Sequence, residues 1–235
     1  MTLLEAIDVR VSRRTYKPEP LTESDAWKIQ AALDEYAQPR MRMALAEANL
    51  KASYGLFSGV RNSILLLARD GDPTAKERLG YFGELVVLRA AAMGLGTCWM
   101  GMYDKSACPV ALAEDEYLVL AINVGYVEAP RGKEKLLHGV VKRKTKSVEQ
   151  LSVTDSAPPD WFVAGVRAAQ KAPSAVNRQP VTFAYQNGAV TAAVKGYDGS
   201  YEAIDLGIAK AHFALAAGGT WEWGNGGAFT KGAQG

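Results

Sequence analysis

A chain of 235 residues, 48% of them hydrophobic, is long enough to bury a sizeable core as one large domain or two small ones. Its 27 lysines and arginines nearly balance 25 aspartates and glutamates, so the charge gives no reason to expect nucleic acid or a membrane surface as a partner. The two cysteines, Cys98 and Cys108, are too few for a disulfide framework and indicate a reducing compartment, for which we expect the cytoplasm. We expect no targeting signal and no membrane span, because no stretch reaches the roughly 20 apolar residues that a span needs.

The first half of the chain alternates helical and strand patterns. Apolar residues at helical spacing predict a short opening helix, and a capping box from Thr22 to Asp25 predicts the start of a second helix. Asp72 caps well and Pro73 is favoured in a first turn, so the longest helix should begin there and end at Gly94. The remaining patterns predict strands at residues 41–46, 63–68 and 117–127 and a short helix at residues 109–112.

The second half follows a change in composition. The run at residues 131–146 contains seven lysines and arginines against one acid, which is typical of a solvated loop, although one or two of its cations could reach a phosphate. Asn187-Gly188 is a strong hairpin signal, because both residues tolerate the positive φ that tight hairpins require. We expect the glycine-rich tail at residues 224–235 to be poorly ordered. The other patterns predict a helix at residues 160–171, strands at residues 181–185 and 189–194, and a last helix at residues 202–217.

Two arginines and a serine alternate along a short stretch after the opening helix. Arg10, Ser12 and Arg14 lie close together there. Guanidinium groups bind phosphate through parallel hydrogen bonds, so the set is suited to cradle a phosphate. A single arginine is far more often an ordinary surface residue, and the interpretation therefore depends on the whole set.

A polar turn follows the helix expected at residues 160–171. Pro173 interrupts that helix, because proline lacks an N–H and disfavours helical geometry in the residue before it. Ser174, Asn177 and Gln179 can then direct their side chains at a ligand, and the two amides supply both donors and acceptors. Ordinary turn chemistry explains such a sequence equally well when it occurs alone.

A glycine-rich stretch joins the longest helix to the strand after it. It runs from Gly94 to Gly101, and glycine lets a backbone approach a flat ring closely. We exclude a Rossmann-type dinucleotide fingerprint, because no glycine occupies position 99 and because the stretch ends a helix where the fingerprint would open one. Cys98 is better explained as a small packing residue than as a redox thiol, since no Cys-x-x-Cys pair occurs.

Together, the elements R-x-S-x-R at residues 10–14 and P-S-x-x-N-x-Q-P at residues 173–180, with the stretch at 94–101, resemble the FMN-dependent nitroreductase family. Members generally take the first element from one subunit and the last from the other, whereas both lie on this chain. The resemblance covers nearly the whole chain and is to the subgroup of single-chain pseudo-dimers. It implies an α+β fold with a mainly antiparallel sheet flanked by helices, in two half-units at residues 1–150 and 151–235, joined around residues 147–158.

The resemblance also implies which residues hold FMN. The R-x-S-x-R element and one basic residue, for which we choose Arg143, would bind the phosphate, and Arg14 could also lie near the pyrimidine edge of the ring. The backbone of the glycine-rich stretch would lie against the ring and donate a hydrogen bond to flavin N5. The predicted cofactor-binding residues are Arg10, Ser12, Arg14, Thr97, Cys98, Trp99, Met100, Gly101, Arg143, Pro173, Ser174, Asn177 and Gln179.

The function implied by the resemblance is an NAD(P)H-dependent FMN oxidoreductase, in which hydride passes through flavin N5 to a small acceptor such as a nitroaromatic or a quinone. No side chain is expected to act as a catalytic nucleophile or obligatory base. Trp99, Ala175 and Val181 depart from residues common in the family and leave the acceptor open. Because one chain carries both elements, the monomer should be able to bind flavin.

Two other functions remain open at this point. The chain could store or sense FMN without turnover, or the scaffold could carry another flavin reaction, such as reductive dehalogenation or flavin breakdown. A metal site is unsupported, because no acidic or histidine-rich cluster occurs at ligand spacing, and structural roles explain His138 and His212 better. The sequence contains neither a nucleophile elbow nor a P-loop.

Overall fold

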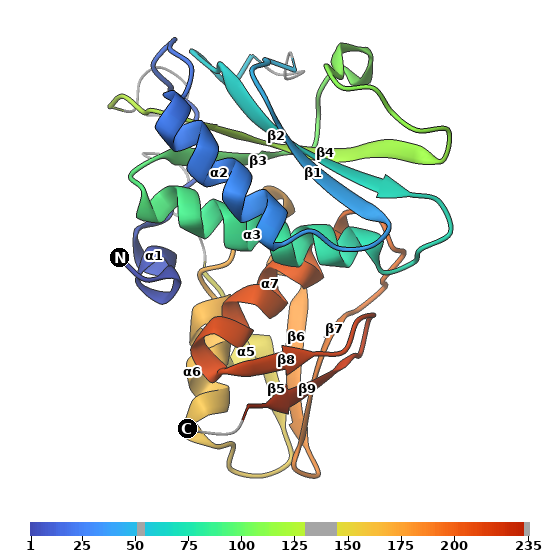
Figure 1. Cartoon of the computed structure of the whole chain (residues 1–235). Coiled ribbons are helices and arrows are strands. Elements are labelled where there is room, and N and C mark those ends of the chain that lie inside the picture. Colours follow the sequence, from blue (N-terminus) through green and yellow to red (C-terminus); the bar gives the residue numbers. More distant parts are fainter. Residues whose placement is uncertain (51–54, 130–144, 233–235) are drawn as a thin grey trace. The chain divides into compact units, whose positions relative to one another are not determined.

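The computed structural model of the chain describes residues 1–50, 55–129 and 145–232. The chain divides into two compact units, each built on its own sheet with helices packed against it (Figure 1). Unit 1 comprises Met1, Val9–Asp72 and Val86–Lys142, and unit 2 comprises Thr2–Asp8, Pro73–Leu85 and Arg143–Gly235. The α+β class predicted from the sequence is confirmed.

Unit 1 contains a four-stranded antiparallel sheet with the strand order β1-β2-β4-β3. Helix α2 (Glu23–Glu35) packs against β1, and the Thr22 hydroxyl caps it by accepting a hydrogen bond from Asp25 N at 3.2 Å, as the capping box predicted. The strands are β1 (Met41–Ala46), β2 (Asn62–Arg69), β3 (Gly96–Met100) and β4 (Glu116–Gly125).

The core of unit 1 explains why β2 carries an uninterrupted apolar run. All of β2 except Arg69 is buried, because the strand lies inside the sheet between β1 and β4. One core cluster brings Leu65 and Leu67 of β2 together with Leu118 of β4 and Met100 of β3. This packing fixes β3, which carries part of the predicted site, at an edge of the sheet.

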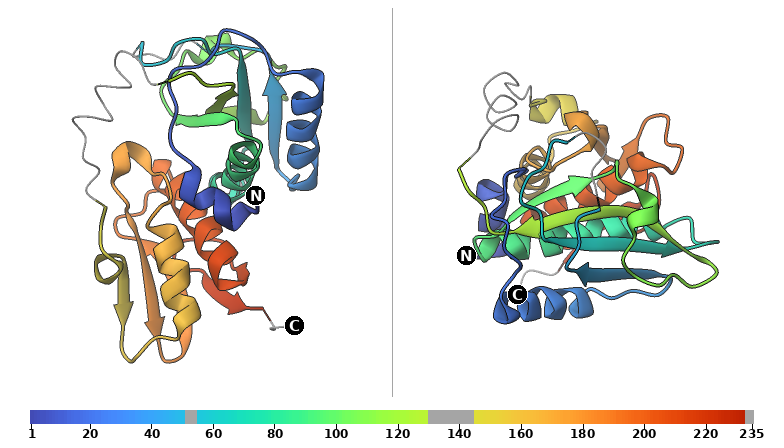
Figure 2. Two further views of the ribbon diagram at one scale, coloured as in Figure 1. Left: turned by 90° about the vertical axis from the view of Figure 1, so that its left-hand side faces the viewer. Right: turned by 90° about the horizontal axis from the view of Figure 1, so that it is seen from above.

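Unit 2 contains a five-stranded sheet with the order β5-β6-β7-β9-β8. Its strands pair antiparallel except β5 and β6, which run parallel and lie side by side in Figure 2. Asn187 and Gly188 connect β6 and β7 at φ values of 51° and 75°, which confirms the predicted hairpin. The strands are β5 (Ser152–Thr154), β6 (Val181–Gln186), β7 (Ala189–Val194), β8 (Gly219–Trp221) and β9 (Ala228–Lys231).

Helices α6 (Asp160–Ala169) and α7 (Tyr201–Ala217) pack against each other and form the core of unit 2 with its sheet. Aromatic rings fill this core: Phe213 of α7 stacks on Phe183 of β6, with ring centroids 4.9 Å apart. Two shorter elements, α1 (Leu3–Val9) and α5 (Val148–Leu151), precede them in the chain. Helix α7 ends at Gly218, whose φ of 69° is the usual left-handed helix cap.

The longest helix, α3 (Ala75–Ala92), contributes its first turns to unit 2, where they pack closely on α7. A Cβ on Gly80 or on Gly207 would clash with backbone of the facing helix, so glycine permits the close approach. Two buried polar pairs join the same helices: Lys210 Nζ donates to Glu77 at 2.6 Å, and His212 Nε2 lies 2.9 Å from Glu84. His212 is thus a buried residue with structural partners.

The C-terminal segment corrects one expectation. Residues 224–232 are not a loose tail, because Ala228–Lys231 form β9, which pairs with both β7 and β8. Lys210 holds the turn before β9 by donating to the carbonyls of Glu222 and Gly224, at 2.9 and 3.0 Å. Burial lowers the pKa of Lys210, and the negative charge of Glu77 opposes that shift.

The short helix predicted at residues 109–112 is also wrong. The chain forms a 3-10 turn, η1 (Lys105–Ala107), a few residues earlier and continues without helix to β4. The Asp104 carboxylate accepts hydrogen bonds from Ser106 N and Oγ, and these bonds favour a turn here, before the predicted residues.

Gly96 and Gly125 are cross-strand partners that provide a matched test of packing at β3. A Cβ on Gly96 would clash with the Val127 side chain and lie 3.1 Å from Cβ of Arg13, whereas a Cβ on Gly125 would only touch Tyr16 at 3.4 Å. We expect Gly96→Ala to lower the free energy of unfolding by about 1–3 kcal/mol. Urea denaturation measures the effect, with Gly125→Ala as the control; equal losses in both variants would contradict this account of Gly96.

Candidate functional site

In unit 1, the arginine-rich element lies along the edge strand β3. Ser12 forms a parallel bridge with Thr97, and Arg13 N donates to Thr97 O at 2.8 Å. The chain beyond the element continues in extended form, with Tyr16 N donating to Ser58 O at 2.9 Å. The structure therefore brings together two segments that the sequence separates by more than 80 residues, and both belong to the predicted site.

The three arginines of this element differ in their surroundings. Arg13 donates to the Glu128 carbonyl, so its side chain ties the element to the segment after β4. Arg10 is buried, with 6% of its surface exposed. Arg14 makes one long hydrogen bond, from Nη1 to Ser12 O at 3.5 Å, and its buried Nε has no hydrogen-bond partner among the described residues. A buried guanidinium nitrogen without a partner is a donor that an anion could satisfy.

The β3 residues of the predicted site have mostly buried side chains. Thr97, Cys98 and Met100 are at most 4% exposed, and Met100 belongs to the core cluster of unit 1. Cys98 Sγ donates to Trp99 O at 3.5 Å, which fits its interpretation as a packing residue. A ligand at this strand would therefore meet backbone atoms and the half-buried Trp99 and Gly101 more readily than the other side chains.

In unit 2, the turn between α6 and β6 carries the second predicted element, at residues 173–180. Its centre is a 3-10 segment, η2 (Ala175–Asn177), that begins after Ser174. Val176, Asn177 and Gln179 have φ values of 45°, 58° and 48°, in the region that favours glycine. Positive φ is a genuine outlier for a β-branched residue such as Val176, and strained backbone of this kind occurs preferentially at functional sites.

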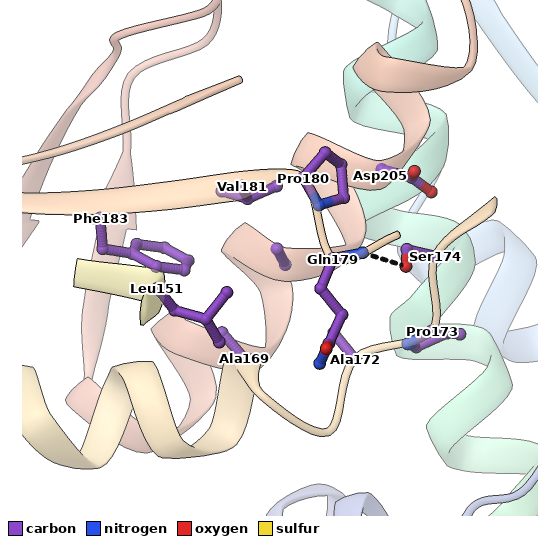
Figure 3. Close-up of a pocket in the computed structure, with 11 residues that line it drawn as sticks. Leu151, Ala169, Ala172, Pro173, Ser174, Gln179, Pro180, Val181, Phe183 and Asp205 are labelled. Carbon is purple, nitrogen blue, oxygen red and sulfur yellow. Dashed lines mark hydrogen bonds between the residues drawn. The ribbon is translucent and has the colours of Figure 1, made fainter. Parts of the chain in front are cut away.

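Two side chains stabilise the end of this turn from within. Ser174 Oγ accepts a hydrogen bond from Gln179 N at 2.9 Å (Figure 3). The Gln179 side chain, 8% exposed, accepts from Lys146 N at 2.9 Å and donates to Gln170 O at 3.0 Å. Lys146 Nζ also donates to Gln179 O at 2.8 Å. Gln179 thus connects the turn to the residues around it, so within the predicted site its side chain supports the turn.

Asn177 differs from Gln179 because its side chain is available. It is half-buried, and its amide has no hydrogen-bond partner in the part of the chain that the structure describes. Val176 beside it is 85% exposed. The turn therefore presents one free amide next to an exposed apolar side chain, which suits a ligand with both polar edges and apolar surface.

A small cavity lies behind the turn, between it and α7. Figure 3 shows Ser174, Gln179 and Asp205 around it together with Pro173, Pro180 and apolar side chains. Its volume is about 20 Å³, which is room for about one water molecule and far too little for an aromatic cofactor. This cavity is therefore not the ligand site, and the residues that face it support the turn from behind.

Asp205 of α7 holds the start of the turn. Its carboxylate oxygens lie 3.0 and 3.2 Å from Ala175 N, which donates to them, and only 6% of the residue is exposed. Burial raises the pKa of the Asp205 carboxyl to about 6, while the hydrogen bond from Ala175 N acts in the opposite direction. Asp205 was not among the residues predicted from the sequence, although an acid among Ala203, Ile204, Leu206 and Gly207 on an apolar helix was a usable signal.

One residue of the predicted site is not among those that the structure describes. Arg143, the predicted third phosphate ligand, lies outside the described residues. Within the described residues, no group of three or more histidines, cysteines and acids could hold a metal ion. No described helix is long and apolar enough to span a membrane.

The comparison with protein families decides the affiliation of the chain. The family model described as "Putative TM nitroreductase" matches residues 2–217. The chain belongs to this nitroreductase family. Membership places it among the oxidoreductases and confirms the resemblance inferred from the three sequence elements.

Solved structures show the same fold. A "putative nitroreductase" from Thermotoga maritima matches with a TM-score of 0.68 at 21% identity, over 97% of this chain and 92% of that chain. An FMN-dependent nitroreductase from Clostridium difficile matches with a TM-score of 0.47 at 16% identity, over 54% of this chain and 88% of that chain. The first match confirms the nitroreductase-like fold, and no argument rests on the second. A search of curated proteins finds no match.

The strain at Val176 can be tested through stability. Positive φ costs a β-branched residue roughly 1–3 kcal/mol, whereas asparagine tolerates this conformation. We expect Val176→Asn to raise the free energy of unfolding by about 1 kcal/mol, since the exposed side chain loses no buried contact. Val153→Asn, at a half-exposed position on the extended strand β5, is the control and should not stabilise. Unchanged or lower stability of Val176→Asn in urea denaturation would argue against strain.

Proposed function

We propose that this nitroreductase family member is an FMN-dependent oxidoreductase that transfers hydride from NAD(P)H to a small acceptor such as a nitroaromatic or a quinone. The observation that carries the proposal is the state of Arg14, a cation with a buried guanidinium nitrogen that lacks a partner among the described residues. A buried donor of this kind is costly unless a ligand satisfies it, and the phosphate or the ring edge of FMN is such a ligand. The family membership supplies the redox class.

The arginine-rich element at residues 10–14 and the turn at residues 173–180 have different tasks in this proposal. Arg10 and Arg14 would neutralise negative charge on the cofactor through their guanidinium groups, and the Ser12 hydroxyl would add a hydrogen bond. Asn177 would supply a donor and an acceptor to a polar edge, and its available amide supports this role. Because both sequence elements lie on one chain, we propose that a single chain suffices for FMN binding.

The remaining predicted residues would act through backbone or support. Thr97, Cys98 and Met100 are buried, so β3 would contribute backbone atoms and not these side chains. Gln179 and Ser174 would keep the turn in shape from within. When bound, FMN would supply the hydride acceptor and donor, and no side chain of the chain is assigned as a nucleophile or base.

An absorbance experiment tests the proposal most simply. We expect the purified protein to carry flavin, or to take it up from added FMN, and we expect NADH or NADPH to bleach the flavin within seconds under anaerobic conditions. Binding without bleaching would support storage or sensing of FMN and contradict the oxidoreductase. A colourless protein that takes up no FMN would contradict every flavin function.

Substitutions test the assignment of residues. We expect Arg14→Gln to raise the dissociation constant for FMN by about 10- to 100-fold, because a hydrogen bond to a charged group contributes roughly 1.5–3 kcal/mol. Asn177→Gly keeps the positive φ accessible while removing the amide, and should raise the constant roughly fivefold. Arg61→Gln removes a cation of unit 1 that pairs with Glu47 at the surface, and serves as the control. Binding equal to the control in both variants, measured by flavin fluorescence, would mean that the pocket is misplaced.

A further inference from the structure

We propose that Asp205 is the positioning residue of the site: it holds the turn at residues 174–179 in the conformation that presents Asn177. The inference rests on the proposed FMN function and assigns to this residue a role that the predicted site did not include. The geometry that carries it is the pair of short distances from its carboxylate to Ala175 N, 3.0 and 3.2 Å.

The turn needs support at both ends, because its backbone is strained. Three of its non-glycine residues have positive φ, and for Val176 and Gln179 this conformation persists only when surrounding contacts enforce it. Gln179, through Lys146 and Gln170, fixes the end that leads into β6. Asp205 fixes the beginning, from the buried helix α7. Asn177 lies between these two attachments, so its placement depends on both.

Asp205 acts through the turn and not on a ligand. The cavity that it faces holds about one water molecule, so neither an aromatic ring nor a phosphate reaches it from that side. Two other charged groups act on it: Glu202, one helical turn earlier on α7, repels its negative charge, and Arg178 of the turn attracts it. Lys146 is engaged on the other side of Gln179, with the Gln179 carbonyl.

The charge on Asp205 has opposite effects on stability and on the turn. Its pKa of about 6 in the folded protein lies above the ordinary value of 3.8, because burial disfavours the carboxylate. The folded state therefore takes up the proton more readily than the unfolded state, and this contribution to stability is full below pH 3.8 and is lost as the pH rises through about 6. The charged form, however, accepts the stronger hydrogen bond from Ala175. At neutral pH the protein would keep a destabilising charge that orders the turn.

Asp205→Asn separates these two effects, because it removes the charge and keeps an acceptor of the same shape. Relative to the wild type at pH 7.5, we expect the variant to be equally or more resistant to urea and to bind FMN about fivefold more weakly. Hydrogen exchange of the peptide that contains Ala175 should be faster, with or without FMN. A residue that only stabilises the fold would lose urea resistance together with affinity.

The pH dependence of FMN binding gives a second readout of the role of Asp205. Phosphate monoesters themselves take up a proton at about pH 6. The wild type is therefore compared with the variant at each pH, so that protonation of the FMN phosphate affects both equally. Between pH 7.5 and 5, the ratio of the two FMN dissociation constants should fall toward one, as wild-type Asp205 becomes protonated. Asp160→Asn, which makes the same change at an exposed aspartate in the first turn of α6, is the control and should change FMN affinity by less than about twofold.

The outcomes distinguish this inference from the proposed function. Absence of FMN binding by the wild type would contradict the proposed function, while hydrogen exchange at Ala175 would still decide whether Asp205 orders the turn. If the wild type binds FMN and Asp205→Asn binds it equally well at every pH, with unchanged exchange, Asp205 is not the positioning residue. Weaker binding, faster exchange and retained urea resistance in the variant would support it.

Discussion

The turn at residues 174–179 can keep its backbone conformation only while groups outside its strained centre hold it. Three non-glycine residues adopt positive φ there, and the hydrogen bonds from Ala175 to Asp205 and from Gln179 to its neighbours offset that cost. Everything proposed for Asn177 depends on this constraint, because a relaxed turn would move the amide. The strain is therefore best understood as the cost of presenting a binding group in a fixed position.

Helix α7 provides most of this control in unit 2. It is buried along nearly its whole length, yet it carries Asp205, Lys210 and His212. Each has a specific partner: Asp205 holds the turn, Lys210 binds Glu77 and the segment before β9, and His212 lies against Glu84. Buried polar groups are tolerated only when they are paired, so these contacts fix the helix in one register. A single element thereby sets the position of the turn and of the C-terminal strands.

The sequence predicted those elements that are determined by residues close to one another in the chain. The Thr22 cap, the Asn187-Gly188 hairpin and the apolar run of β2 each follow from neighbouring residues, and the structure confirms them. The ordered strand β9 was missed because its stability comes from β7 and β8 and from Lys210, which lie far away in the sequence. The partnership of Asp205 with Ala175 was missed for the same reason, since it spans 30 residues.

The account depends most directly on whether one chain holds one FMN. Titration of the cofactor-free protein with FMN, followed by flavin fluorescence and combined with the mass of the complex in solution, measures this stoichiometry. The account predicts saturation at one FMN per chain in a species whose protein mass is that of the 25.2 kDa monomer. Saturation at one FMN per two chains, or no saturable uptake at all, would contradict it.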